Sequence, residues 1–87
     1  MNIAEWRERI DAIDRQLVEL LNQRCQCARE IGRLKKELAL PIYEPNRETA
    51  VLENAQQANQ GPLSPMALRR VFERVIDEMR AAQKELP

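Results

Sequence analysis

The stretch LNQRCQCAREIGRLKKE, residues 21–37, continues a helical pattern that starts near the N-terminus and decides the fold of this chain. Apolar residues recur there at alternating steps of three and four, which is typical of one apolar stripe along a helix. The stripe consists of Ile3, Trp6, Ile10, Ile13, Leu17, Leu20, Cys27, Ile31, Leu34 and Leu38. Arg24 occupies the position between Leu20 and Cys27, so a permanent charge stands on the face that the helix should bury.

The stripe predicts one long helix from residue 3 to about residue 38, which is roughly 54 Å in length. Gly32 weakens this helix by about 1 kcal/mol relative to alanine, and Pro41 ends it. Pro45 suits the first turn of a second helix, because that turn does not use the missing N–H. Ser64 and Pro65 predict the N-cap and the first residue of a third helix.

The second and third helices carry apolar faces of their own. These faces consist of Val51, Leu52, Ala55 and Ala58, and of Leu68, Val71, Phe72, Val75, Ile76, Met79, Ala82 and Leu86. We therefore predict an all-α fold of one very long and two shorter helices, in a single domain over residues 1–87. Because the shorter helices need cover themselves, we expect an intertwined helical homodimer in which two long helices pack together.

The composition excludes several classes of function. The chain has 14 basic and 14 acidic residues, a formal net charge of +0, which argues against nucleic acid and acidic membranes as partners. There is no histidine, and Cys25 and Cys27 point to nearly opposite sides of a helix, so we expect neither a metal site nor a disulfide. Free thiols fit a reducing cytosol. The charged start MNIAEWRERID predicts no signal peptide, and no stretch approaches the roughly 20 apolar residues of a membrane span.

Several polar residues interrupt or border the apolar faces. Arg24 needs an anionic partner, either a carboxylate such as Glu48 or a bound anion, because an unpaired buried charge is strongly unfavourable. Lys35 lies three turns further along nearly the same face, and Arg7 of a second chain could approach both in an antiparallel dimer. The other polar residues beside an apolar face are Arg47, Glu48 and Gln83.

Each of these residues alone has a structural explanation: a helix cap, a charge that fixes register, or a solvent-facing edge. Together they describe an apolar helical interior that holds several cations, one carboxylate and one amide. A dianionic small molecule would satisfy that set. The sequence offers no nucleophile–base pair and no phosphate-binding glycine loop, so any catalysis would rest on electrostatics and positioning.

The motifs WRERIDAIDRQLVELLNQR, AREIGRLKKE, PIYEPNRE and VFERVIDEMRAAQ together resemble those of the all-helical, AroQ-class chorismate mutases of the small bacterial type. The resemblance covers residues 3–83 without large gaps. It implies an intertwined, cytoplasmic helical dimer whose two active sites draw on both chains. The implied reaction is the rearrangement of chorismate to prephenate, without a cofactor, in phenylalanine and tyrosine biosynthesis. Some small members of the family need an activating partner enzyme of the pathway.

The resemblance also implies roles for residues of this chain. Arg24 and Arg7 of the second chain would hold the two carboxylates of the substrate. Lys35 would contact a carboxylate and the ether oxygen of the breaking bond, and Gln83 would donate to the same oxygen. Glu48 would accept a hydrogen bond from the ring hydroxyl.

Three further positions complete the implied site. Arg47 and Glu44 would border the ring hydroxyl. Met79 stands where many family members have a serine or another small residue that helps to bind a carboxylate. Because methionine cannot donate a hydrogen bond, we expect weaker substrate binding or a compensating donor.

Two other functions are compatible with these residues. An isochorismate–pyruvate lyase of the same fold would use a similar cationic pocket and release pyruvate in a pericyclic step. A non-catalytic helical dimerisation or regulatory module would use the charges on the stripe only to fix the register of the helices. The chain is compatible with a free-standing enzyme and with a domain of a larger pathway protein.

Overall fold

Three helices build the fold in the computed structural model, which describes residues 1–85. They are α1 (Ile3–Glu37), α2 (Pro45–Ala58) and α3 (Pro65–Lys84), and no strand occurs among the described residues. Within this part of the chain, none of the helices has the length and apolar character that crossing a membrane requires. Leu86, the last apolar position expected in the third helix, lies outside the described residues. The predicted all-α fold, with one very long and two shorter helices, is confirmed.

The helix starts follow capping residues of the sequence. At the start of α1 the Asn2 side chain accepts a hydrogen bond from the backbone N–H of Glu5 at 2.9 Å. At the start of α3 the Ser64 hydroxyl oxygen accepts from the backbone N–H of Ala67 at 3.1 Å. Pro45 opens α2, where a missing backbone donor costs nothing. The predicted starts of the second and third helices are therefore confirmed.

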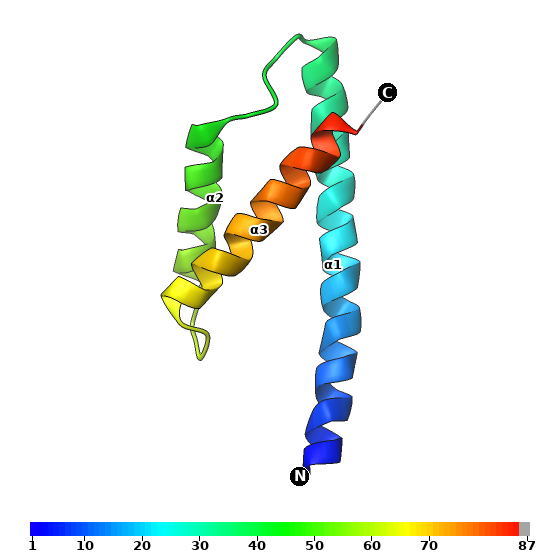
Figure 1. Cartoon of the computed structure of the whole chain (residues 1–87), viewed down its shortest axis with the longest axis vertical. Coiled ribbons are helices and arrows are strands. Elements are labelled where there is room, and N and C mark those ends of the chain that lie inside the picture. Colours follow the sequence, from blue (N-terminus) through cyan, green and yellow to red (C-terminus); the bar gives the residue numbers. More distant parts are fainter. Residues whose placement is uncertain (86–87) are drawn as a thin grey trace.

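The last helix, α3, contacts both other helices and holds the chain together (Figure 1). Its C-terminal half crosses the second half of α1, and its start lies beside the end of α2. The most deeply buried apolar residues are Ala28 of α1 and Ile76, Met79 and Ala82 of α3. The core of the single chain therefore lies mainly where α3 meets α1.

The N-terminal end of α1 projects beyond the other two helices, and the N-terminal half of α1 stands apart from them (Figure 1). Its apolar stripe stays open in the single chain, where Trp6 is 52 % and Leu17 is 51 % exposed. The chain measures 54 × 26 × 15 Å, so the long axis is set by α1 alone. The expectation that the two shorter helices do not cover the stripe is confirmed.

Gly32 lies at a close approach of α1 and α3. A Cβ atom placed on Gly32 would stand 2.9 Å from both the Cα atom and the carbonyl oxygen of Gln83. Real side-chain carbons do not come so close to backbone atoms, so the contact with α3 requires a glycine here. The low helix propensity of Gly32 is offset by this close packing.

We expect Gly32→Ala to lower the free energy of unfolding by about 1–3 kcal/mol, the usual cost of overpacking. Without the contact to α3, the same substitution would stabilise α1 by about 1 kcal/mol. Chemical denaturation followed by circular dichroism measures the change. Arg29→Ala, at an exposed position of the same helix, is the control. A Gly32→Ala variant more stable than the wild type would contradict the close contact.

Candidate functional site

A cavity of about 380 Å³ lies among α1, α2 and α3, a volume typical of sites for small organic molecules. Its polar lining consists of Arg24, Lys35, Glu44, Arg47, Glu48, Arg80 and Gln83. Its apolar lining consists of Cys27, Ala28, Ile31, Ile42, Val51, Ile76 and Met79. The fold of one chain thus brings together every site residue expected from the sequence except Arg7.

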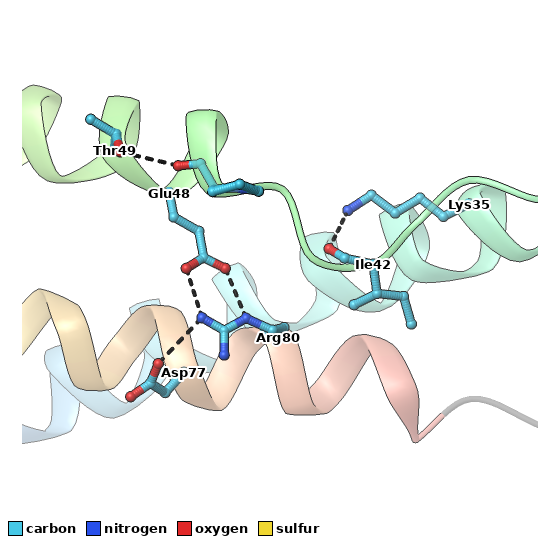
Figure 2. A network of polar contacts seen from close by, with 7 residues as sticks. Lys35, Ile42, Glu48, Thr49, Asp77 and Arg80 are labelled. Atoms are coloured by element: carbon cyan, nitrogen blue, oxygen red, sulfur yellow. Dashed lines mark hydrogen bonds and ion pairs between the residues drawn. The ribbon is translucent and has the colours of Figure 1, made fainter.

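Lys35 is the buried cation of this cavity, with 8 % of its surface exposed. Its ammonium donates to the carbonyl oxygen of Ile42 at 2.9 Å (Figure 2) and to Gln83 Oε1 at 3.1 Å. It also forms an ion pair with Glu44 Oε1 at 2.6 Å. An ammonium has three donors, and these partners come from α3 and from the connection between α1 and α2. The positive charge is therefore held from two sides.

Gln83 faces α1 from the last turns of α3 and is half-buried. The sequence left open whether Gln83 faces the core or solvent. Its hydrogen bond with buried Lys35 shows that it faces the interior. Because its oxygen accepts from Lys35, its NH₂ group is the part that can donate to a bound molecule. Lys35 and Gln83 together present hydrogen-bond donors at one place in the cavity.

Glu48 and Arg80 form a bidentate ion pair between α2 and α3 (Figure 2). Arg80 Nε donates to Glu48 Oε2 at 2.8 Å, and Arg80 Nη2 donates to Glu48 Oε1 at 2.6 Å. The hydrogen bonds from Arg80 hold the pKa of Glu48 below its ordinary range, against the opposing effect of partial burial. Among the described residues, Glu48 pairs with Arg80 and forms no ion pair with Arg24, so Glu48 is not the partner of Arg24 in the single chain.

The remaining site residues differ in burial. Arg24 is half-buried and lines the cavity, so the charge on the apolar stripe points to a site rather than to a closed core. Arg47 is exposed near the start of α2, whereas Met79 is buried, with 8 % of its surface exposed. Arg7 lies in the first turns of α1 and does not line the cavity of its own chain.

Arg80 is the site residue that the sequence patterns did not single out. A signal was present, since Arg80 follows Ile76 by four positions and precedes Gln83 by three, which places all three on one helix face. In a helix rich in charged residues, however, one more arginine resembles an ordinary surface residue. Only the fold shows that Glu48 stands opposite.

The cavity favours an anionic ligand. Four cationic side chains and two carboxylates line it, and a cavity lined by an excess of one sign concentrates ions of the other. Arginine guanidinium groups match carboxylates in a bidentate manner. Among residues 1–85 there is no group of three or more side chains suited to hold a metal ion. The fold and this lining define a class of all-α proteins that hold a small organic anion between helices.

Comparison with known families narrows this class. Residues 6–84 match the family described as chorismate mutase type II. The chain belongs to this family, and the resemblance of its motifs to AroQ-class chorismate mutases is confirmed.

Individual relatives agree with this assignment. The chorismate mutase of Thermus thermophilus (Form II) superposes with a TM-score of 0.93 at 31 % identity, over 95 % of this chain and 94 % of that chain. The chorismate mutase of Helicobacter pylori, solved in complex with prephenate, gives a TM-score of 0.85 at 32 % identity, over 98 % and 97 % of the two chains. The bifunctional chorismate mutase/prephenate dehydratase of Neisseria gonorrhoeae is 42 % identical over 80 residues, which are 92 % of this chain and 22 % of the relative. The chain thus spans less than a quarter of the length of such curated relatives.

The depressed pKa of Glu48 gives the stability of the protein a defined pH dependence. The stabilisation by the ionised carboxylate is fully present above about pH 4.3, the ordinary pKa of glutamate, and is lost as the pH falls through the lower pKa of the folded state. We expect the gap in unfolding free energy between wild type and Glu48→Gln to be constant between about pH 7 and 5 and to shrink below about pH 4. Urea denaturation at a series of pH values measures it.

Glu53→Gln, at an exposed position of α2, is the control for the removal of one carboxylate from the helix. A gap between wild type and Glu48→Gln that stays constant down to about pH 3 would contradict the ion pair with Arg80.

Proposed function

We propose that this chain catalyses the rearrangement of chorismate to prephenate, a step towards phenylalanine and tyrosine. The observation that carries the proposal is the contact between buried Lys35 and Gln83 inside a cavity with an excess of cations. Membership of the chorismate mutase type II family and the likeness to the Helicobacter pylori enzyme in complex with prephenate support it. The reaction is intramolecular: one C–O bond breaks and one C–C bond forms, so the enzyme need not supply a nucleophile.

We propose that Lys35 and Gln83 donate hydrogen bonds to the ether oxygen of the breaking C–O bond. Negative charge collects on the ether oxygen as the C–O bond lengthens, and donors aimed at this oxygen bind the transition state more tightly than the ground state. Because all three donors of Lys35 have partners, the substrate must replace one of them. The Glu44 carboxylate, whose side chain is 49 % exposed, is the partner that water solvates most readily after its release.

The arginines hold the substrate in its reactive shape. Arg24 and Arg7 of the partner subunit bind the two carboxylates and keep the enolpyruvyl side chain folded over the ring, the compact form that the reaction needs. Arg47 and Glu48 border the ring hydroxyl, which donates to the Glu48 carboxylate. Met79 offers no donor to a carboxylate, so we expect weaker binding than in a relative with serine there.

We propose a homodimer as the functional unit. The apolar stripe on the first half of α1 stays open in the single chain; its residues there are Ile3, Trp6, Ile10, Ile13, Leu17 and Leu20. Two copies with antiparallel long helices would cover both stripes. The same arrangement would bring Arg7 of the partner subunit to the cavity, which lacks it in a single chain.

We further propose a cytoplasmic location, supported by the free thiols Cys25 and Cys27, since a reducing compartment preserves such thiols. An enzyme that consumes prephenate is the class of partner that we expect. The name of the Neisseria gonorrhoeae relative, which joins chorismate mutase to prephenate dehydratase, supports this expectation.

Purified protein should convert chorismate to prephenate, measured as the loss of ultraviolet absorbance and by NMR of the product. Lys35→Ala should lower kcat by about 10²–10³-fold, the typical loss when one oxyanion donor is removed. Lys36→Ala is the matched control, because this neighbouring lysine is exposed and does not line the cavity.

The outcomes separate the candidate functions. If chorismate is not consumed, isochorismate is the next substrate, and release of pyruvate and salicylate would identify a lyase of the same fold. No turnover of either compound would contradict an enzyme that is active by itself, and would favour a helical dimerisation module or a mutase that needs an activating partner enzyme. Equal losses in Lys35→Ala and Lys36→Ala would contradict the role of Lys35.

A site shared between subunits predicts that two inactive variants restore each other. Arg7→Ala and Lys35→Ala each disable both sites of their own homodimer, whereas a mixed dimer contains one intact site. Joint unfolding and refolding of equal amounts should recover about a quarter of the wild-type activity, because half of the dimers are mixed and each has one intact site. Analytical ultracentrifugation verifies the dimer. No recovery in mixed dimers would show that Arg7 does not complete the partner's site.

A further inference from the structure

Arg80 holds the Glu48 carboxylate with one edge of its guanidinium. The hydrogen bonds of 2.8 and 2.6 Å engage both carboxylate oxygens, the bidentate arrangement of the strongest arginine–carboxylate pairs. A carboxylate offers about four acceptor sites, so about two stay open once Arg80 is bound. Glu48 is thus held in one orientation and can still accept a hydrogen bond from a ligand in the cavity that both residues line.

Two further contacts hold the guanidinium of Arg80. Its central carbon lies 5.1 Å from the centre of the Tyr43 ring, within the distance of a cation–π contact. Its Nη2 also reaches Asp77 Oδ1 at 3.4 Å, and Figure 2 shows Arg80 between Asp77 and Glu48. The connection between α1 and α2, the first turn of α2 and the body of α3 therefore meet at this one side chain.

The pair is shielded from solvent more than the other ion pairs along α3. The side chains of Arg80 and Glu48 are 27 % and 24 % exposed, whereas those of Arg74 and Glu78, a pair within α3, are 77 % and 61 % exposed. Exposed pairs contribute little, because solvent and salt screen them. The Arg80–Glu48 pair is therefore screened less than these exposed pairs, and its two hydrogen bonds define the orientation of the carboxylate.

We propose that Arg80 is a positioning residue that fixes the ionised Glu48 carboxylate in the orientation that accepts a hydrogen bond from the ring hydroxyl of the substrate. This inference rests on the proposed function, because it concerns the orientation of Glu48, the residue that would accept the hydrogen bond from the substrate hydroxyl in the same site. Arg80 acts through Glu48, because its Nε–Nη2 edge is occupied by that carboxylate.

The charges around Glu48 determine how the loss of Arg80 appears in a pH profile. The titratable and charged groups that share the cavity with Glu48 or contact Arg80 are Arg24, Lys35, Tyr43, Glu44, Arg47 and Asp77. Among residues 1–85, Arg80 is the one side chain that donates hydrogen bonds to the Glu48 carboxylate, and these bonds are the main cause of the lowered pKa of Glu48. Arg80→Met therefore raises the pKa of Glu48, and activity that needs the ionised form is lost at a higher pH.

The test measures kcat, KM and the pH profile of kcat/KM for Arg80→Met, Arg80→Lys, Glu48→Gln and the double variant Arg80→Met/Glu48→Gln. Arg80→Met should lower kcat/KM for chorismate by up to about 10²-fold, the loss that a misplacement of about 1 Å can cause, and move the acid limb to higher pH. Arg80→Lys keeps the positive charge but loses the planar, bidentate guanidinium. Relative to Arg80→Met, its acid limb should therefore lie closer to that of the wild type, and its kcat/KM should be partly recovered. The double variant should lose no more than Glu48→Gln alone, because both changes remove one interaction.

Arg74→Met is the matched control, because it removes an exposed arginine–glutamate pair from the same helix. It should match the wild type in kcat/KM and in the acid limb. Thermal unfolding followed by circular dichroism identifies any variant that is unfolded under assay conditions. If Arg80→Met is unfolded, Arg80→Lys replaces it, and the kcat/KM and acid limb of Arg80→Lys are compared with those of Glu48→Gln and of the double variant Arg80→Lys/Glu48→Gln.

A chorismate analogue in which hydrogen replaces the ring hydroxyl sharpens the test. With no hydroxyl for Glu48 to bind, the wild type and Arg80→Met should convert this analogue with equal kcat/KM. An unmoved acid limb, additive losses in the double variant, or an equal loss on chorismate and the analogue would each overturn the inference while leaving the mutase activity in place. A wild-type protein that does not convert chorismate would overturn the proposed function and this inference together.

Discussion

The close contact of α3 with α1 at Gly32 is the constraint on which the rest of the structure depends. Because this position has no side chain, the backbone of Gln83 rests directly on α1, where a Cβ atom would stand 2.9 Å from the Cα of Gln83. Lys35 lies one turn further along α1, so the same contact brings its ammonium within 3.1 Å of Gln83 Oε1. The other residues that α3 contributes to the cavity, including Met79 and Arg80, take their positions from this crossing.

The site holds its charges in place with partners from the chain itself. Lys35 is largely removed from water, which would be strongly unfavourable without the acceptors that surround it. Glu48 is kept ionised by Arg80 in the same way. Fixed charges and dipoles of this kind need little reorganisation when a ligand enters, and this preorganisation is the main source of catalysis in reactions without a nucleophile or proton transfer. Lys35 and Glu48 thus have partners within the chain, and in the proposed function a dianion would replace some of these partners.

The open stripe on the first half of α1 limits what a single chain can achieve. The two shorter helices, of 14 and 20 residues, pack against each other, and α3 also packs against the second half of α1. A chain of this size buries only a modest share of its surface. In the proposed dimer, the apolar residues that would join the subunits and Arg7, which would complete the site of the partner subunit, lie on the same half of α1. The first half of α1 would therefore serve both the assembly of the dimer and its activity.

The sequence by itself determined the three helices, their starts and the residue types of the site. Apolar periodicity and caps such as Ser64 act between neighbours in the chain, so local rules are sufficient for them, and the family motifs named seven of the polar and cationic positions of the proposed site. Only the tertiary structure decided which charges meet: Glu48 pairs with Arg80 rather than Arg24, and Lys35 is the buried cation. The contact of Lys35 with Gln83 depends on how α3 crosses α1, and the pair of Glu48 with Arg80 depends on how α3 packs against α2; these contacts join residues 48 and 32 positions apart. A pattern read along the chain holds no information on that crossing, because the periodicity of a helix specifies which face is apolar but not the angle at which another helix covers it.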